Sequence, residues 1–143
     1  MACRNHSGLT LLEILILLLV FAGLAALVYP VVVERLDDYR VEQAEADLEA
    51  LSSALEKYKL DNHFYPTTQQ GLQALVARPT SGPTPKNWNP AGYLSRGVVP
   101  LDPWGQPYRY ESREDGRYYE ISTLGGDTEP GGEGVAADIK VSR

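Results

Sequence analysis

Cysteine is almost absent from this chain of 143 residues, which contains a single one, Cys3. One thiol excludes an intrachain disulfide and a metal site built from several thiolates. Histidine is nearly as scarce. Only His63 lies beyond the first eight residues, which excludes a zinc site made of clustered histidines. The sequence also lacks a nucleophile motif and a glycine-rich phosphate loop that follows a strand. We therefore expect a protein that is not an enzyme.

Charge is missing from one long stretch near the N-terminus. The 20 residues from Ile14 to Val33 contain no acidic or basic side chain. As a helix that rises about 1.5 Å per residue, this stretch would span roughly 30 Å, the thickness of the hydrocarbon core of a bilayer. All acidic residues except Glu13 lie beyond it, and the net charge is −6. We expect a membrane segment joined to an acidic domain, and this charge disfavours a protein that binds nucleic acid.

Glu13 stands directly before the apolar run and bears on how that run is interpreted. A cleaved secretory signal and a plain signal anchor are two interpretations, but an acidic residue lies where the apolar core of a signal peptide should begin. By insertion scales, an ionised carboxylate in a membrane helix costs about 2.5–3.5 kcal/mol, so its presence indicates a function. The simplest alternative is a side chain that reaches back to the lipid headgroups.

The residues around Glu13 carry a third interpretation. Residues 7–13 read Ser-Gly-Leu-Thr-Leu-Leu-Glu, which resembles the processing site of type IV prepilins and pseudopilins. The resemblance implies a leader of residues 1–8, cleavage by a prepilin peptidase between Gly8 and Leu9, and N-methylation of the new terminus. Glu13 would be the fifth mature residue and would pair with the amino terminus of a neighbouring subunit during assembly. Leu9 departs from the family, which usually has phenylalanine there.

The charges that flank the apolar run predict its orientation in a membrane. Arg4 precedes the run, whereas net negative charge follows it. The leader should therefore face the cytoplasm and the domain the periplasm. We expect residues 9–33 to form a transmembrane and assembly helix that crosses the bacterial inner membrane once, and residues 34–143 to form a periplasmic domain.

Residues 34–143 are expected to fold as an α+β domain. Apolar residues recur at spacings of three and four, which predicts an amphipathic helix that ends at about residue 61. This stripe consists of Val41, Ala44, Leu48, Leu51, Leu55 and Tyr58. Four prolines make residues 78–90 an irregular loop. Two short β-type runs, 108–111 and 118–121, flank the hairpin signal Asp-Gly, so a small antiparallel sheet should follow, and then a glycine-rich acidic loop.

Several motifs in this domain resemble those of the major pseudopilins of type II secretion systems. They are Tyr-Lys-Leu-Asp-Asn at 58–62, Tyr-Pro-Thr at 65–67, Gln-Gly-Leu at 70–72 and Asp-Pro-Trp-Gly at 102–105. The resemblance implies a pilin-like fold, in which the long helix packs on the small sheet. It also implies a structural subunit whose copies form a helical fibre that helps export folded periplasmic proteins through an outer-membrane secretin. The implied partners are minor pseudopilins, an inner-membrane assembly platform with its ATPase, and the prepilin peptidase.

Two other functions stay open at this point. A type IV pilin for adhesion, motility or DNA uptake has the same plan. Many such pilins close their C-terminal region with a disulfide, and this chain has no cysteine there. The second alternative is a membrane-anchored periplasmic enzyme or binding module.

The C-terminal loop is rich in oxygen donors. Residues 127–138 read Asp-Thr-Glu-Pro-Gly-Gly-Glu-Gly-Val-Ala-Ala-Asp, which fits an EF-hand poorly and by composition is either a solvated acidic loop or a site for Ca²⁺. The resemblance to major pseudopilins implies a structural Ca²⁺ here. The expected ligands are the carbonyl of Leu124, the carboxylates of Asp127 and Asp138, and Glu129 near a position that contributes a carbonyl. Alanine at 136–137 stands where many relatives have a second acid, so Glu133 or a backbone oxygen would have to replace it.

Overall fold

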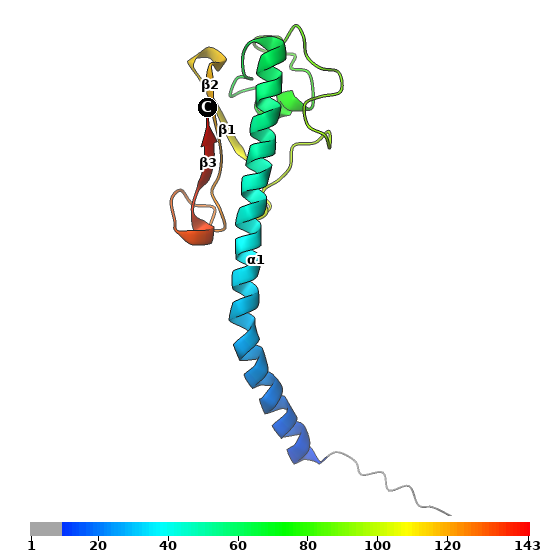
Figure 1. Cartoon of the computed structure of the whole chain (residues 1–143), viewed down its shortest axis with the longest axis vertical. Coiled ribbons are helices and arrows are strands. Elements are labelled where there is room, and N and C mark those ends of the chain that lie inside the picture. The colour runs from blue at the N-terminus through cyan, green and yellow to red at the C-terminus, as the bar shows by residue number, and fades with distance from the viewer. Residues whose placement is uncertain (1–9) are drawn as a thin grey trace, which may run out of the picture. The chain divides into compact units, whose positions relative to one another are not determined.

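The computed structural model describes residues 10–143, and it consists of one long helix and a small antiparallel sheet (Figure 1). Helix α1 spans Leu11–Asn62, and the strands are β1 (Arg109–Arg113), β2 (Tyr118–Thr123) and β3 (Ile139–Ser142), in the sheet order β1-β2-β3. Three short 3₁₀ turns complete the chain: η1 (Leu72–Leu75), η2 (Glu114–Gly116) and η3 (Gly134–Ala136). The predicted α+β class is confirmed. The chain divides into two compact units between Asp37 and Asp38, and α1 contributes to both.

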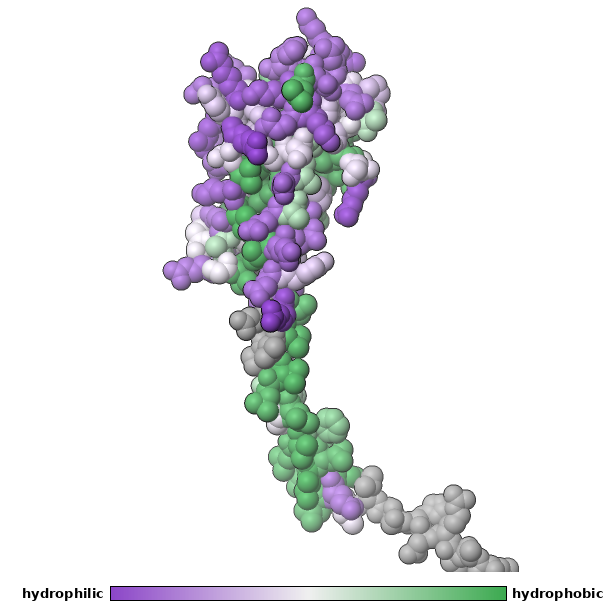
Figure 2. Space-filling view, in the orientation of Figure 1, coloured by the Kyte–Doolittle hydropathy of each residue, from purple (hydrophilic) through white to green (hydrophobic). Residues whose placement is uncertain are grey.

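The first unit contains the N-terminal part of α1. The segment Leu11–Tyr29 is long and apolar enough to cross a membrane, and none of it is buried by the rest of the chain. Leucine and alanine, which are frequent here, favour helix. This part of the helix presents a mostly hydrophobic surface (Figure 2). An exposed apolar surface of this length indicates contact with lipid or with another protein.

The second unit is built on the C-terminal part of α1. The predicted apolar stripe is confirmed, because Val41 is half-buried and the other members of the stripe are fully buried. Strand β2 contributes Tyr119 and Ile121 to the same core. Within this core the hydroxyl groups of Ser52 and Tyr119 share a hydrogen bond of 2.7 Å. Apolar burial and one buried polar contact together hold the helix against the sheet.

The end of α1 is fixed by its own cap. The helix ends at Asn62, close to the expected position, and His63 follows with a left-handed φ of 70°. His63 donates its backbone N–H to the carbonyl of Lys59 at 2.7 Å. The Asn62 side chain donates to the carbonyl of Tyr58 and accepts the N–H of Asn87, which ties the helix end to the proline-rich loop. His63 is exposed and belongs to the cap.

The sheet confirms one part of the sequence-based prediction and adds a strand to it. Strands β1 and β2 form the predicted antiparallel hairpin around η2, where Asp115 and Gly116 have φ angles of 55° and 83°. Strand β3 was not expected, and it pairs antiparallel with β2 through the partners Ile121 and Val141. The glycine-rich loop therefore leaves one strand and enters its neighbour, so its two ends are held side by side.

Candidate functional site

The start of α1 is closed by a capping box, in which Thr10 and Glu13 satisfy each other's polar groups. The Glu13 carboxylate accepts hydrogen bonds from the Thr10 N–H at 2.8 Å and from the Thr10 hydroxyl at 3.0 Å. The Thr10 hydroxyl in turn accepts the N–H of Glu13 at 3.2 Å. This reciprocal pattern stabilises a helix N-terminus. The predicted processing residues Gly8 and Leu9 lie outside the described residues.

The C-terminal loop is closed by direct contacts between its two arms. The N–H of Gly126 donates to the carbonyl of Val135 at 2.9 Å. A Cβ atom on Gly125 would lie 2.8 Å from the Val135 oxygen and 2.9 Å from the Ala137 oxygen, and its φ of 70° also favours glycine. The carbonyl oxygens of Val135 and Ala137 therefore face the segment that includes Leu124, one of the predicted ligands.

The acidic residues of the loop differ in their surroundings. Asp127 and Glu129 are exposed, and the Asp127 carboxylate accepts the N–H of Glu129 at 3.1 Å. Asp138 is half-buried, and within residues 10–143 its Oδ1 atom is buried without a hydrogen-bond partner. A buried polar atom without a partner is costly. Asp138 therefore has an oxygen available to a ligand that enters this loop.

The structure brings the predicted metal ligands onto one loop but not into one cluster of carboxylates. Nowhere in residues 10–143 do three His, Cys, Asp or Glu side chains lie close enough together to hold a metal. The oxygen donors of the loop are instead mixed: the Oδ1 atom of Asp138, which has no partner among residues 10–143, and the carbonyls of Val135 and Ala137. Such a set of oxygen donors suits a hard cation such as Ca²⁺, which also takes backbone carbonyls.

A second polar centre, which sequence reasoning missed, lies in the turn that precedes the sheet. The Asp102 carboxylate is 5% exposed, and its Oδ1 atom accepts the N–H groups of Trp104 and Gln106 at 3.1 and 2.7 Å. Its Oδ2 atom accepts the hydroxyl of Thr123. The Thr123 oxygen also accepts the N–H of Gly125 at 3.3 Å. The motif Asp-Pro-Trp-Gly marked this turn in the sequence, but nothing local pointed to Thr123.

A small hollow of about 200 Å³ adjoins this turn. Its lining comes from the turn, from the residues that lead into β1, and from the loop residues Leu124, Gly125 and Thr128. The hydroxyl of Tyr108, which also lines the hollow, donates to the carboxylate of Asp47 on α1 at 3.3 Å. Burial raises the pKa of Tyr108, and Asp47 adds to this effect, so the phenol keeps its proton and remains a donor.

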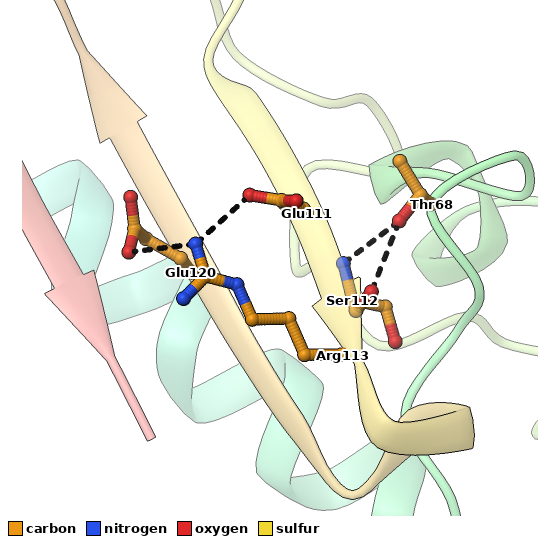
Figure 3. Close-up of polar contacts among 5 residues, drawn as sticks. All are labelled: Thr68, Glu111, Ser112, Arg113 and Glu120. Atoms are coloured by element: carbon orange, nitrogen blue, oxygen red, sulfur yellow. Dashed lines mark hydrogen bonds and ion pairs between the residues drawn. The ribbon is translucent and has the colours of Figure 1, made fainter.

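The outer edge of β1 and the exposed face of the hairpin are occupied by contacts within the domain (Figure 3). The Thr68 hydroxyl accepts the N–H of Ser112 at 2.9 Å and donates to its carbonyl at 3.3 Å. On the exposed face, the Nη2 atom of Arg113 lies 3.1 Å from a carboxylate oxygen of Glu111 and 3.7 Å from one of Glu120. Glu111 and Glu120 are paired across β1 and β2. The hydrogen bond to Glu111 and the charges of both acids raise the pKa of Arg113. Arg113 thus offsets the repulsion between two facing carboxylates.

The fold and the exposed apolar helix segment define a class, the pilin-like proteins with an α+β domain and an N-terminal apolar helix. The family described as "Type II secretion system (T2SS), protein G" matches residues 31–142. The chain therefore belongs to the type II secretion system protein G family. This family consists of structural pseudopilin subunits rather than enzymes, in agreement with the expectation from the sequence.

Named relatives and a solved structure show the same family. A type II secretion system core protein G from Pseudomonas aeruginosa is 47% identical over 136 residues, which cover 95% of this chain and 94% of the relative. One from Vibrio cholerae is 43% identical and covers 95% and 91%. The crystal structure of the major pseudopilin from the type 2 secretion system of enterohaemorrhagic Escherichia coli matches with a TM-score of 0.60 and 40% identity, over 73% of this chain and 87% of that one.

Proposed function

We propose that this chain is the major structural subunit of a type II secretion pseudopilus. Its copies form a helical fibre that helps export folded periplasmic proteins through an outer-membrane secretin. Membership of the protein G family supports this function. The single observation that carries the assembly role is the segment Leu11–Tyr29, which is apolar and entirely exposed in one copy. Such a surface is stable in lipid, and again in a fibre where copies of the segment bury one another.

The proposal includes a location and partners. Before assembly, the apolar segment crosses the bacterial inner membrane once, with the domain in the periplasm, because Arg4 precedes the segment and acidic residues follow it. An inner-membrane assembly platform with its ATPase extracts the subunit into the fibre, alongside minor pseudopilins. A prepilin peptidase first removes residues 1–8 between Gly8 and Leu9, and the new terminus is N-methylated.

Glu13 has two roles in this proposal, and a substitution can distinguish them. Its carboxylate closes the capping box with Thr10 of the same chain. In the fibre, its negative charge pairs with the positive amino terminus of a neighbouring subunit. A glutamine side chain retains the cap, because its amide oxygen still accepts the Thr10 N–H, but it carries no charge.

The assembly proposal is tested by comparing Glu13→Gln with Thr10→Val in cells that secrete a reporter protein. We expect Glu13→Gln to be processed normally but to abolish fibre formation and reporter secretion. Thr10→Val removes the hydroxyl of the cap and keeps the charge, so it should retain most assembly. Mass spectrometry should find a chain that starts at N-methylated Leu9 in both variants. Normal fibres from Glu13→Gln would refute the charge-pairing role, and an intact N-terminus would refute the processing step.

We also propose that the C-terminal loop binds a structural Ca²⁺, with Leu124, Asp127, Asp138 and Glu129 as its candidate ligands. The Oδ1 atom of Asp138 supports this assignment, because it is buried without a hydrogen-bond partner among residues 10–143 and an ion would satisfy it. The nearby carbonyl oxygens of 135 and 137 can take the place of the carboxylate that the alanines at 136–137 do not supply. Bound Ca²⁺ would join the arms of the loop and hold it in one conformation.

The calcium proposal predicts a melting temperature that depends on the ion. An ion that binds only the folded chain stabilises it in proportion to the logarithm of its concentration. We expect the full chain in detergent micelles to melt at a higher temperature in millimolar Ca²⁺ than in excess EGTA, and Asp138→Asn to lose most of this difference. The same concentration of Mg²⁺ serves as the control. An equal melting temperature in Ca²⁺ and EGTA would refute the site.

A further inference from the structure

The turn Asp102–Gln106 and the C-terminal loop are far apart in the sequence but meet at two points. At the first, the Thr123 hydroxyl donates to the Asp102 carboxylate and accepts the N–H of Gly125. At the second, the indole of Trp104 lies against Gly126, where a Cβ atom would come within 3.1 Å of the indole nitrogen. These two contacts lie on either side of Leu124, and the second directly precedes Asp127.

From this arrangement we infer that Asp102 and Thr123 are positioning residues, which hold the C-terminal loop in its cation-binding conformation before any ion arrives. The inference deepens the proposed calcium site and rests on it for the identity of the ion. The hydrogen-bonded pair of Asp102 and Thr123, which we call the brace, depends only on contacts within the chain. Neither Asp102 nor Thr123 is a proposed calcium ligand. Each acts through the backbone of the loop that carries the ligands.

Burial makes this brace effective. Asp102 is 5% exposed and Thr123 is 1% exposed, so water cannot replace either partner easily. The Asp102 carboxylate is also fixed on its other side, because its Oδ1 atom accepts two N–H groups of its own turn. The turn is closed further by the bond from the Asp102 N–H to the Gln106 carbonyl at 2.8 Å. A rigid turn therefore presents one oriented oxygen to Thr123, and hydrogen bonds to a charged acceptor are the stronger kind.

The position of the brace explains what it would contribute to binding. Gly125 packs on the carbonyls of Val135 and Ala137, so fixing its N–H also fixes the distance between the two arms of the loop. A loop that contains several glycines loses much conformational entropy when it is ordered. If the brace orders the loop in advance, the ion does not bear that cost, and binding is tighter.

The test uses Thr123→Val, which keeps the volume of the side chain and removes its hydroxyl, in the full chain in detergent micelles. Hydrogen exchange in EGTA reports the loop directly, and we expect the amides of residues 125–138 to exchange about tenfold faster or more, while those of β1 and β2 change less. Calorimetric titration with Ca²⁺ alone should give a dissociation constant raised about tenfold or more. Thr123→Ser keeps the hydroxyl and should restore both values towards those of the unmodified chain.

Thr68→Val provides the matched control, because the Thr68 hydroxyl also makes two backbone hydrogen bonds but at the outer edge of β1. It should leave loop exchange and Ca²⁺ affinity unchanged. Asp102→Asn is the second variant: its amide oxygen can still accept the two N–H groups of the turn, whereas the oxygen that accepts the Thr123 hydroxyl becomes an NH₂ group, so the loop amides should again exchange faster. Unchanged loop exchange in Thr123→Val would overturn the brace. Faster exchange spread evenly over the whole domain in Thr123→Val and Asp102→Asn would also overturn it. Absence of Ca²⁺ binding to the unmodified chain would refute the calcium site alone, because the exchange data in EGTA still decide the brace.

Discussion

The two parts of α1 belong to one helix, yet they bury their side chains in different ways. In Leu11–Tyr29 no residue is buried by the rest of the chain. In the second unit, Leu48, Leu51 and Leu55 are completely buried in a core that β2 and the segment 65–93 complete. The difference shows that helix geometry alone does not decide the role of a leucine. The first part needs lipid or other copies of the chain, and the second part finds its partners within its own domain.

Alkaline pH should produce the largest difference in stability between the two parts of α1. Burial raises the pKa of Tyr58 from its ordinary value of 10.0 to about 12, and it also raises the pKa values of Tyr65, Tyr108 and Tyr110. The folded domain therefore binds these protons more tightly than the unfolded chain does. Its stability is fully present below pH 10 and falls as the pH rises towards 12.

In micelles we expect the domain to unfold while the apolar part of α1 remains helical. Near-ultraviolet circular dichroism of the tyrosines should collapse above pH 10, while part of the helical far-ultraviolet signal persists. Replacing Tyr58 by phenylalanine should move the transition to higher pH, because one buried proton is no longer lost. Simultaneous loss of both signals would contradict the separation.

Truncation of one leucine in each part gives a smaller effect and a sharper comparison. Leu51→Ala removes a fully buried side chain and should lower the free energy of unfolding of the domain by about 2–5 kcal/mol. Leu17→Ala, at a side chain that is 57% exposed, leaves no cavity and should leave that free energy almost unchanged. Urea denaturation of both variants in the same detergent measures the difference. A large loss of domain stability from Leu17→Ala would mean that the first part of the helix packs on its own chain.

Features with a local cause in the sequence were predictable. The buried stripe follows from the 3.6-residue period of the helix, the end of α1 near residue 61 from the proline that follows at Pro66, and the hairpin from the turn signal at Asp115 and Gly116. Strand β3 was missed although Ile139–Ser142 alternates apolar and polar residues, because no short turn signal joins it to β2. The two strands pair across the whole glycine-rich loop, and nothing local in the sequence marks that pairing.

The polar centre at Asp102 escaped prediction for a related reason. Asp102 and Thr123 are 21 positions apart, and only the folded sheet brings them together. Either side chain alone suits a turn or a strand end equally well. The calcium ligands stay a prediction drawn from family resemblance, to which the structure adds one local observation: the buried Oδ1 atom of Asp138 has no hydrogen-bond partner within residues 10–143.

The hydroxyl of Thr68 has a consequence for how copies of this chain meet. By bonding both the N–H and the carbonyl of Ser112, it occupies the place that a strand from another molecule would take beside β1. The opposite edge is a strand of four residues with Lys140 exposed, which also discourages such pairing. A subunit of a pseudopilus is thereby protected from joining its sheet edge to edge with the sheet of another copy.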